Sequence, residues 1–387
     1  MTDTVTGARG TTQTLPPRAY FDADWFEREQ LELFGRTWHY AGTADDYAAP
    51  GAYRSIQAGR HPLVVVRGHD GELRAFHNVC RHRGTAVLPG SGRVERHIVC
   101  PYHNWRYGLD GCLLAVTQRK EVDPGLDRSE LGLHPAAAAV WRGLVFVHPD
   151  PEPEPLTDWL ADLPDRMAPY DPEQLAEVGA ARQYHLKCNW KVFMENALDN
   201  YHLGYVHKDT LVGYDHKRQE QYRCGERHWY FYEPPLEPGR LPPMDAGSGL
   251  KPIAQDPHWY GSSFGLIFPN LFVLTSATWW SSIQVIPTGP ETTTLELRAR
   301  FLPGQTGRIA LGALREAASG LVQRVLAQGI LRRQPAYDLV EEDVFCCEAV
   351  QVGIKSPRFS VGPLAYRLEG GIQTFQRNVL DYVPLEG

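Results

Sequence analysis

The chain has 387 residues, of which 43% are hydrophobic and 22% charged, and this composition excludes wholesale disorder and a collagen-like fibre. The formal net charge is −7 and Lys and Arg form no dense block, which argues against a nucleic-acid-binding protein. No stretch approaches the ~20 apolar residues of a membrane-spanning helix, so we expect no membrane association. The polar, Thr-rich N-terminus has no apolar segment of secretory type, and we therefore expect cytoplasmic localisation, where seven cysteines do not form a disulfide framework.

Residues 1–44 are predicted to form an N-terminal tail, over residues 1–17, and a helix that packs on the larger domain. Asp22 is a residue type that caps helix N-termini, and apolar residues recur around it at near-helical spacing. These apolar residues are Phe21, Trp25, Phe26, Leu31 and Phe34.

Residues 45–150 are predicted to form a small all-β domain. Short β-like runs, such as Leu63–Val66, His97–Cys100 and Leu144–His148, are separated by turns rich in Gly, Pro and Asp. The Pro- and Glu-rich segment Pro149–Pro155 then indicates a stiff linker, which places a domain boundary near residue 150.

Residues 151–387 are predicted to form an α+β domain in which helices cover an antiparallel sheet, a helix-grip-like arrangement. Helical segments are predicted at Leu156–Met167, Trp190–Tyr205, Gly307–Ile330 and 338–350. The expected strands of the meander are Phe264–Phe268, Leu271–Thr275, Trp280–Ile286 and Thr292–Phe301.

Two short segments of the all-β domain each combine a thiolate with an imidazole. They read Cys80-Arg-His82 and Cys100-Pro-Tyr-His103, with 17 residues between His82 and Cys100. Two Cys and two His suit tetrahedral zinc. They also suit a Rieske [2Fe–2S] cluster, in which the two Cys hold one iron and the two His hold the other. The spacing favours the cluster, because zinc fingers group the Cys pair and the His pair separately.

A second group of metal-binding residue types lies in the larger domain. On a helix, Glu195, Asp199 and His202 fall on one face, whereas His207 lies about 140° around from His202. Gly204 offers a place where the helix can loosen so that both imidazoles converge. Two His and one carboxylate form the ligand triad of non-haem Fe(II) oxygenases.

Three residues can supply the carboxylate ligand, and composition does not choose among them. They are Asp199, Glu342 and Asp343.

The sequence resembles the Rieske non-haem iron oxygenase α-subunits. The Cys-x-His and Cys-x-x-His halves are followed by Arg-Gly and Trp, and the larger domain carries Asn-Trp-Lys, Glu-Asn-x-x-Asp-x-x-His-x₄-His and Glu-Asp-x₇-Gln-x-Gly. The resemblance implies a cluster held by Cys80, His82, Cys100 and His103. It also implies mononuclear Fe(II) held by His202, His207 and Asp343.

The resemblance further implies a head-to-tail homotrimer. In the family, electrons cross between subunits, and Asp199 would bridge the iron site to a Rieske histidine of a neighbouring copy, His103. No Gly-x-Gly-x-x-Gly turn is visible, so NAD(P)H is expected to act only through a partner, a ferredoxin or flavin reductase, with O₂ as co-substrate.

The chain is similar to the α-only branch of this family, which includes choline and betaine monooxygenases, demethylases and tailoring hydroxylases. Aromatic residues on the predicted sheet, among them Tyr260, suit a quaternary ammonium group, although an aromatic or natural-product substrate is equally compatible. By strand alternation only one of Trp279 and Trp280 can face inward. The predicted pocket residues are Asn196, Phe264, Phe272 and Trp280.

These observations predict the terminal oxygenase of a multicomponent Rieske monooxygenase, which hydroxylates or oxidatively demethylates a small organic substrate. Alternatives are an aromatic-ring cis-dihydroxylating dioxygenase α-subunit, a Rieske electron-transfer protein without oxygenase activity, and a zinc-stabilised binding module. The remaining cysteines are expected to be buried thiols: Cys112, Cys188, Cys224, Cys346 and Cys347.

Overall fold

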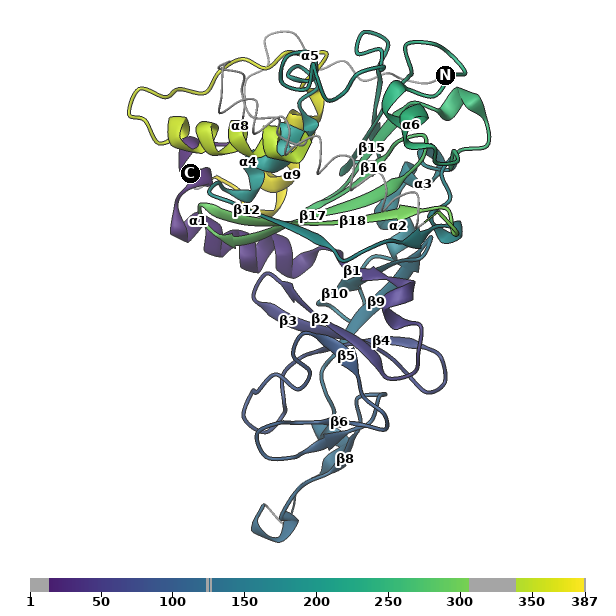
Figure 1. Cartoon of the computed structure of the whole chain (residues 1–387). Helices are drawn as coiled ribbons and strands as arrows, with labels where there is room; N and C mark the ends of the chain where they lie inside the picture. Colours follow the sequence, from purple (N-terminus) through teal and green to yellow (C-terminus); the bar gives the residue numbers. More distant parts are fainter. Residues whose placement is uncertain (1–13, 123–124, 126, 306–338, 386–387) are drawn as a thin grey trace, which may run out of the picture. The chain divides into compact units, whose positions relative to one another are not determined.

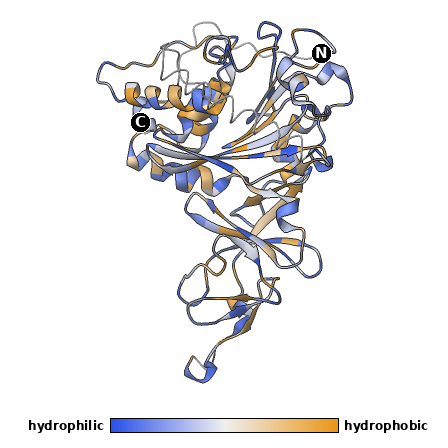
Figure 2. Ribbon diagram, in the orientation of Figure 1, coloured by the Kyte–Doolittle hydropathy of each residue, from blue (hydrophilic) through white to orange (hydrophobic). Residues whose placement is uncertain are grey.

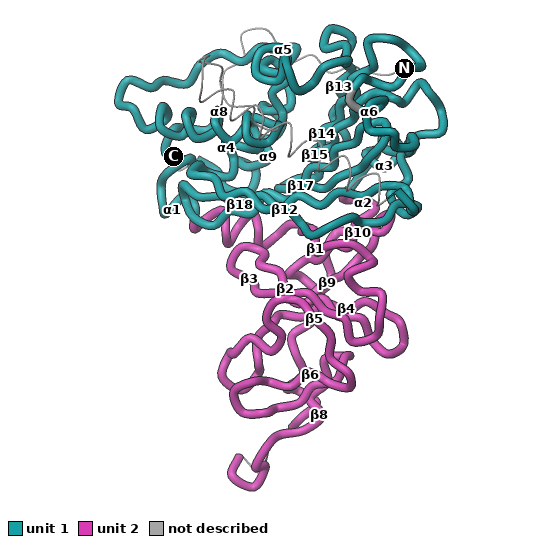
Figure 3. The backbone as a smooth tube through the Cα atoms, in the orientation of Figure 1, with its two compact units in different colours: residues 1–26, 160–387 teal, residues 27–159 magenta. Residues whose placement is uncertain are grey.

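The computed structural model describes residues 14–122, 125, 127–305 and 339–385 (Figure 1). The chain forms two structural units, one of residues 27–159 and the other of residues 1–26 and 160–387 (Figure 3). The domain boundaries predicted from the sequence lie between residues 44 and 45 and between residues 150 and 151, whereas the structural units change at residues 26/27 and 159/160. The helix predicted at Gly307–Ile330 lies outside the described residues. Among the described helices, none is long and apolar enough to cross a membrane.

The unit of residues 27–159 is built on two antiparallel sheets. The larger has the strand order β1-β10-β9-β4-β3-β2-β5 and the smaller the order β6-β7-β8. The strands are β1 (His39–Thr43), β2 (Ala52–Ala58), β3 (His61–Arg67), β4 (Leu73–His77), β5 (Ser91–Arg93), β6 (Ile98–Val99), β7 (Arg106–Tyr107), β8 (Leu113–Ala115), β9 (Pro135–Trp141) and β10 (Leu144–His148).

Strand β3 is buried on both faces and separates two hydrophobic cores. Its alternating side chains are the reason, since Val64 and Val66 enter one core while Leu63 and Val65 enter the other. The first core also contains both cysteines of the predicted cluster, together with Trp105, Tyr107 and Leu109. The sequence therefore builds the predicted metal loops directly onto a packed core.

The other unit contains an antiparallel sheet of order β11-β18-β17-β16-β15-β14-β13, with β12 paired to β18. The strands are β11 (Ala176–Glu177), β12 (Arg182–Leu186), β13 (Glu220–Cys224), β14 (His228–Glu233), β15 (Ser262–Ile267), β16 (Leu271–Thr275), β17 (Trp280–Gly289) and β18 (Thr292–Phe301). The predicted meander from 264 to 301 is confirmed, with β16 and β18 at the predicted bounds.

Helices lie against both faces of this sheet. On one face, the Phe193 ring of α4 contacts Phe272 of β16, and α9 contacts α4 through Phe375 and Trp190. On the other face, Gly265 of β15 lies against Met167, next to α3. Figure 2 shows hydrophobic as well as hydrophilic residues on α8 and α9. The α-helices are α1 (Ala23–Arg28), α2 (Leu156–Leu160), α3 (Leu163–Arg166), α4 (Trp190–Leu198), α5 (Leu203–Val206), α6 (Pro243–Ser248), α8 (Leu339–Ile354) and α9 (Gly370–Tyr382).

The predicted N-terminal helix is present, and Asp22 caps it by accepting a hydrogen bond from the N–H of Trp25 at 2.8 Å. The helix continues from α1 into a π-helical turn and a short 3₁₀ segment. The π-helical turn is Glu29–Leu33, and the 3₁₀ segments are Pro17–Tyr20, Phe34–Arg36, Ala44–Tyr47, Arg119–Glu121, Arg128–Leu131, Pro172–Gln174 and Pro257–Trp259.

Two predicted helices are each broken in two. The segment Leu156–Met167 forms α2 and α3, because Ala161 between them has a positive φ of 51°. The segment Trp190–Tyr205 forms α4 and α5, and the break at Asp199 bears on the iron site described below. The predicted α+β class, with a small all-β domain and a helix-covered antiparallel sheet, is confirmed.

Candidate metal centres

Two loops of the β unit carry the predicted cluster ligands, and they repeat one backbone pattern. In each loop the Cys N–H binds the carbonyl five residues later, and the Cys carbonyl accepts the N–H four residues later. The bonded pairs are Cys80–Thr85 at 2.8 Å, Gly84–Cys80 at 2.9 Å, Cys100–Trp105 at 2.8 Å and Asn104–Cys100 at 3.0 Å.

Each loop closes through a residue with positive φ, which explains why glycine and asparagine stand at these two positions. Gly84 has a φ of 77° and Asn104 a φ of 56°. Glycine adopts this region at no steric cost, and asparagine tolerates it better than most residues. The loops therefore present a cysteine at their start and a histidine at their tip.

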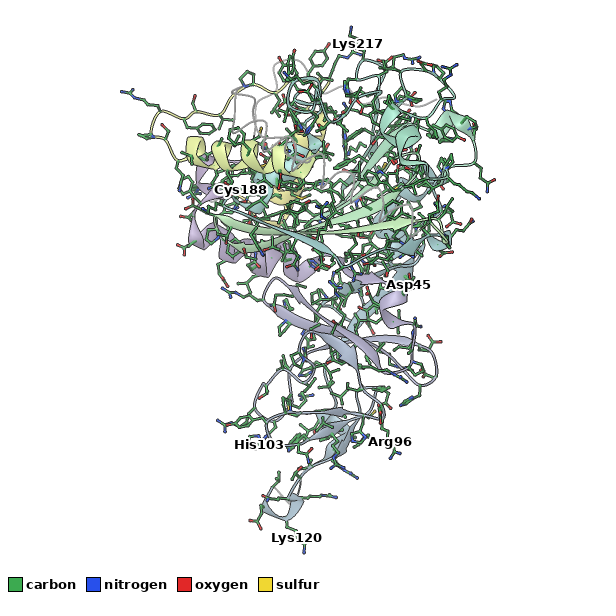
Figure 4. All side chains as sticks on the ribbon, in the orientation of Figure 1. Asp45, Arg96, His103, Lys120, Cys188 and Lys217 are labelled. Carbon is green, nitrogen blue, oxygen red and sulfur yellow. The ribbon has the colours of Figure 1, made fainter. Side chains whose placement is uncertain are left out.

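The thiols and imidazoles of these loops differ in exposure. Cys80 and Cys100 are buried, whereas His82 is exposed and His103 half-buried. The Nδ1 atoms of the two histidines lie 3.1 Å apart, and the His82 ring stacks on Trp105 at 4.9 Å. His103 is labelled in Figure 4, in the part of the unit where Figure 1 places β6 and β8.

This donor set fits a Rieske cluster. Burial raises the pKa of the Cys80 thiol, and the neighbouring Cys100 thiol raises it further, so a bound cation would favour the Cys80 thiolate. Two buried sulfurs and two outward imidazoles match a cluster in which one iron has Cys ligands and the other has His ligands.

The sequence did not single out Tyr107, which lies beside this centre. The Tyr107 hydroxyl is 3.2 Å from Cys80 Sγ and accepts a hydrogen bond from the Arg81 N–H at 3.1 Å. Its position in the short strand after the second loop is the only local signal, and that signal does not by itself indicate a sulfur contact.

The second group of ligands depends on a break in the chain after α4. Asp199 ends α4 in an extended conformation, and α5 begins only at Leu203. The prediction that Glu195, Asp199 and His202 share one helix face is therefore wrong, and the predicted loosening at Gly204 falls too late. The break is stabilised from outside the segment, because the N–H of Asn200 donates to the carbonyl of Leu368 at 3.0 Å.

This break brings two imidazoles and one carboxylate together. The ligand atoms of His202, His207 and Asp343 all lie within 4.8 Å of one another. The two Nε2 atoms are 3.1 Å apart, and Asp343 Oδ1 is 3.5 Å from His202 Nε2 and 3.0 Å from His207 Nε2. Asp343 lies in α8 whereas the two histidines flank α5, so the three residues come from two distant segments.

The other two carboxylate candidates contact the opposite nitrogens of the same rings. Asp199 Oδ2 is 3.2 Å from His202 Nδ1, and Glu342 Oε2 is 2.8 Å from His207 Nδ1. Of the three acids left open by composition, only Asp343 thus reaches the space between the Nε2 atoms. The sequence offered Glu342 as a ligand and missed this contact, whose only signal was the acidic run of residues 341–343.

The electrostatics of the three residues favour a cation between them. Burial alone would lower the pKa of His202, but the nearby carboxylates of Asp199 and Asp343 outweigh it and raise the pKa to about 9. Burial raises the pKa of Asp343, but the two nearby histidines lower it by more, and the resulting pKa is about 2. Among the described residues, the buried Asp343 Oδ1 has no aligned hydrogen-bond donor. An anionic oxygen without a donor, facing two ring nitrogens, fits an Fe(II) ligand.

Strand register divides the predicted pocket residues. Phe264 pairs with Leu274 and Phe272 pairs with Ile283, so both rings lie on the sheet face that contacts α4. Their centroids are 4.6 Å apart, and Phe231 stacks on Phe264 at 4.9 Å. These rings form a continuous aromatic surface on that face.

Trp280 is not part of this surface. It pairs with Thr275, and Thr275 pairs with Ser263, which puts all three side chains on the face opposite Phe264. Alternation separated Trp279 from Trp280 in the sequence, but it did not show which sheet face Trp280 occupies. Asn196 remains near the end of α4, and its Nδ2 atom is buried without a hydrogen-bond partner in the described part of the chain.

The cysteines outside the metal loops are not all buried. Cys188, Cys224 and Cys347 are, whereas Cys112 is exposed and Cys346 is half-buried. The expectation of five buried thiols is therefore wrong for Cys112, which lies in a surface turn. Figure 4 labels Cys188, which directly precedes the segment that begins α4.

Two family patterns match the chain. Residues 37–126 match the Rieske [2Fe–2S] domain, and residues 173–385 match the catalytic domain of the ring hydroxylating alpha subunit. The first match contains both metal loops, and the second contains His202, His207 and Asp343.

Several characterised proteins are similar in sequence. Choline monooxygenase of Spinacia oleracea is 27% identical over 366 residues, 93% of this chain and 76% of the plant protein. The glycine betaine monooxygenase oxygenase subunit of Chromohalobacter salexigens is 37% identical over 206 residues. That second match covers 52% of this chain and 45% of the bacterial subunit.

Solved structures share the fold across both units. A quaternary ammonium Rieske monooxygenase in complex with L-carnitine matches with a TM-score of 0.75 and 23% identity, over 96% of this chain and 95% of that one. Naphthalene 1,2-dioxygenase from Rhodococcus sp. matches with a TM-score of 0.74 and 21% identity, over 96% and 93% of the two chains. Similarities at this level of identity concern the fold alone.

Proposed function

Because the chain belongs to the ring-hydroxylating α-subunit family and carries its catalytic domain together with a Rieske [2Fe–2S] domain, we propose that it is the terminal oxygenase of a multicomponent Rieske monooxygenase. The enzyme is a Rieske-type oxygenase that uses O₂. The observation that carries the proposal is the convergence of His202, His207 and Asp343 within 4.8 Å. An electron carrier would have no use for this second centre.

The proposed ligands follow the two constellations. Cys80, Cys100, His82 and His103 would hold the [2Fe–2S] cluster, and His202, His207 and Asp343 would hold the mononuclear iron. When bound, the cluster supplies single electrons and the iron activates O₂ beside the substrate.

The residues around the iron site set its geometry. Asp199 Oδ2 lies 3.2 Å from His202 Nδ1, on the side of the ring away from Asp343, so the Nε2 atom of His202 faces the space shared with Asp343. The burial of His207 excludes water from one side of that space. The site therefore offers two imidazole nitrogens and one carboxylate oxygen that converge on one point.

We propose that Asp199 also serves electron transfer in a homotrimer. Its side chain is 22% exposed although it contacts His202, so its outer edge can meet a second copy of the chain. Its partner there would be His103, a predicted cluster ligand. A mass in solution of three chains supports this assembly, and a monomeric active enzyme contradicts it.

For the substrate we propose a quaternary ammonium compound. The relatives named above include choline and glycine betaine monooxygenases, and aromatic rings are the residue type that attracts such a cation. Phe231, Phe264 and Phe272 gather on the sheet face that contacts α4. The electrons would come from a separate NAD(P)H-dependent ferredoxin or flavin reductase.

The substitution His202→Ala tests the assignment of the oxygenase site. We expect the variant to keep the rhombic paramagnetic resonance signal of the reduced Rieske cluster and to lose oxygen uptake that depends on added glycine betaine or choline. The matched control is His185→Ala, since His185 is an exposed histidine of β12 in the same unit. The control is expected to keep both properties.

Two outcomes would contradict the proposal. Retained turnover in His202→Ala would refute the site, and a colourless protein that contains only zinc would refute the whole class. Labelled oxygen separates the rival ring dihydroxylation, because a monooxygenase places one atom of ¹⁸O₂ in the product whereas a dioxygenase places two.

A further inference from the structure

Each imidazole of the proposed iron site has a carboxylate at the nitrogen that faces away from Asp343. For His202 this carboxylate is Asp199, only three residues earlier in the chain. For His207 it is Glu342, which comes from α8 and lies 2.8 Å from Nδ1 through Oε2. The two contacts differ in origin and in geometry, because the contact of Glu342 is an aligned hydrogen bond whereas that of Asp199 is a close approach of opposite charges.

We infer that Glu342 is a positioning residue of the iron site, which orients the His207 imidazole and keeps its Nε2 atom free to bind metal. The inference rests on the proposed function, because it takes His207 as a ligand. It assigns to Glu342 a role other than the ligand role that composition allowed.

The contacts of the Glu342 carboxylate support this role. Its Oε2 atom accepts hydrogen bonds both from His207 Nδ1 and from the hydroxyl of Thr210, at 2.8 and 2.7 Å. Thr210 belongs to the turn after α5, and its N–H donates to the carbonyl of His207 at 3.1 Å. One oxygen therefore holds the side chain of the ligand and the turn that carries it.

The order Glu342-Asp343 allows α8 to hold both nitrogens of one ring. Consecutive residues of a helix point about 100° apart. The shorter Asp343 reaches His207 Nε2 at 3.0 Å, and the longer Glu342 reaches Nδ1 on the other side. A proton on Nδ1 that is bonded to Glu342 leaves the lone pair on Nε2, the tautomer that a metal requires.

Asp199 and Glu342 should therefore differ in function. Asp199 retains an exposed edge that can contact a neighbouring copy, whereas Glu342 has Thr210 as its second partner within the chain. Loss of Asp199 should chiefly slow electron delivery. Loss of Glu342 should weaken iron binding itself, which can be measured without any turnover.

The test compares Fe(II) affinity in four variants of the full-length protein, by anaerobic competition with a chromophoric Fe(II) chelator. We expect Glu342→Ala to weaken binding about 10–100-fold, the usual effect of removing a carboxylate behind a ligating histidine. Thr210→Val removes one hydrogen bond and should weaken binding by about 2–10-fold. Glu342→Gln keeps an acceptor oxygen and should recover most of the affinity lost in Glu342→Ala. The control Glu341→Gln should bind iron as the wild type does.

A spectroscopic readout separates orientation from general damage. The nitric oxide adduct of the Fe(II) site should change its paramagnetic resonance signal in Glu342→Ala supplied with excess iron, while the Rieske signal stays unchanged. If Glu342→Ala does not fold, Thr210→Val and Glu342→Gln still decide the matter. If both Glu342→Ala and Thr210→Val bind Fe(II) with wild-type affinity, the inference is overturned. If Glu342→Ala does not fold, wild-type affinity in Thr210→Val alone overturns it.

The result also distinguishes this inference from the proposed function. If His207→Ala leaves Fe(II) affinity unchanged, the ligand assignment fails and the role of Glu342 fails with it. If His207→Ala abolishes binding while Glu342→Ala does not weaken it, only the positioning role is wrong.

Discussion

At the scale of single residues, the hydrogen bond between Tyr107 and Cys80 bears on the redox chemistry of the cluster. The Tyr107 oxygen already accepts the Arg81 N–H, so its own proton points to the sulfur 3.2 Å away. Burial raises the pKa of Tyr107, which keeps the hydroxyl protonated as a donor. A donor to a ligating sulfur stabilises the reduced, more negative cluster and raises its potential.

The substitution Tyr107→Phe should therefore lower the Rieske potential. A net hydrogen bond is worth about 0.5–1.5 kcal/mol, which for a one-electron couple corresponds to about 20–60 mV. A redox titration followed by the paramagnetic resonance signal measures the shift. Tyr53→Phe, in the same unit, is the control and should leave the potential unchanged. Equal potentials in Tyr107→Phe and wild type would show that the sulfur contact has no electronic effect.

Residue types and spacing predicted much of each centre. The alternation of Cys and His in two short segments indicated a cluster without any structure, because each loop is local and closes through its own Gly84 or Asn104. The third proposed iron ligand, Asp343, could not be predicted from residue types and spacing alone. Composition could not separate Asp343 from Glu342, since the choice depends on how α8 lies against α5, and the family resemblance was needed to select it.

At the scale of elements, the break between α4 and α5 shows what local pattern cannot predict. Residues 190–205 have a continuous helical pattern, but Asn200 bonds Leu368 through its backbone and Gln219 through its side chain. These partners lie far along the chain, and their bonds replace those of the helix. Strand bounds were easier to predict, because alternation and turn residues are local.

Glu195 of α4 joins three elements at a half-buried junction. Its Oε1 accepts hydrogen bonds from the Tyr20 hydroxyl at 2.6 Å and from the Gln376 amide of α9 at 2.9 Å. Desolvation raises the pKa of Glu195 from its ordinary value of 4.5 to about 7, against the opposing effects of these bonds and of Lys191.

This shift predicts a pH-dependent stability. Between pH 4.5 and 7 the folded state holds a proton that the unfolded state releases, so stability falls as pH rises through this range. The substitution Glu195→Gln keeps the acceptor oxygen but removes the titration. It should raise the free energy of unfolding by about 1–2 kcal/mol at pH 8 and by little at pH 5.

Denaturant unfolding of the full chain at the two pH values measures this difference. The exposed Glu237, which pairs with nearby Arg240, supplies the control Glu237→Gln. The control should show the same small effect at both pH values. An effect of Glu195→Gln that is equal at pH 5 and pH 8 would contradict the account.

At the scale of the whole molecule, the chain places its two metal centres in separate structural units. The cluster loops belong to residues 27–159, and the iron site belongs to the unit that contains residues 160–387. Strand alternation, turn residues and the Pro-rich linker predicted two domains and the class of each. The assignment of Trp280 to the pocket failed, because alternation along one strand does not say which face of the sheet meets α4.

The central claim is that electrons held by the cluster serve O₂ chemistry at the second centre. The most direct measurement is a single turnover of pre-reduced enzyme with glycine betaine or choline and ¹⁸O₂, in the absence of any reductase. We expect the Rieske signal to disappear as one ¹⁸O atom enters the oxidised carbon, which is recovered as the aldehyde or as released formaldehyde and trapped before its oxygen exchanges with water. The variant His202→Ala should retain its signal without forming product. Cluster oxidation in the wild type without labelled product, or labelled product in His202→Ala, would contradict the central claim.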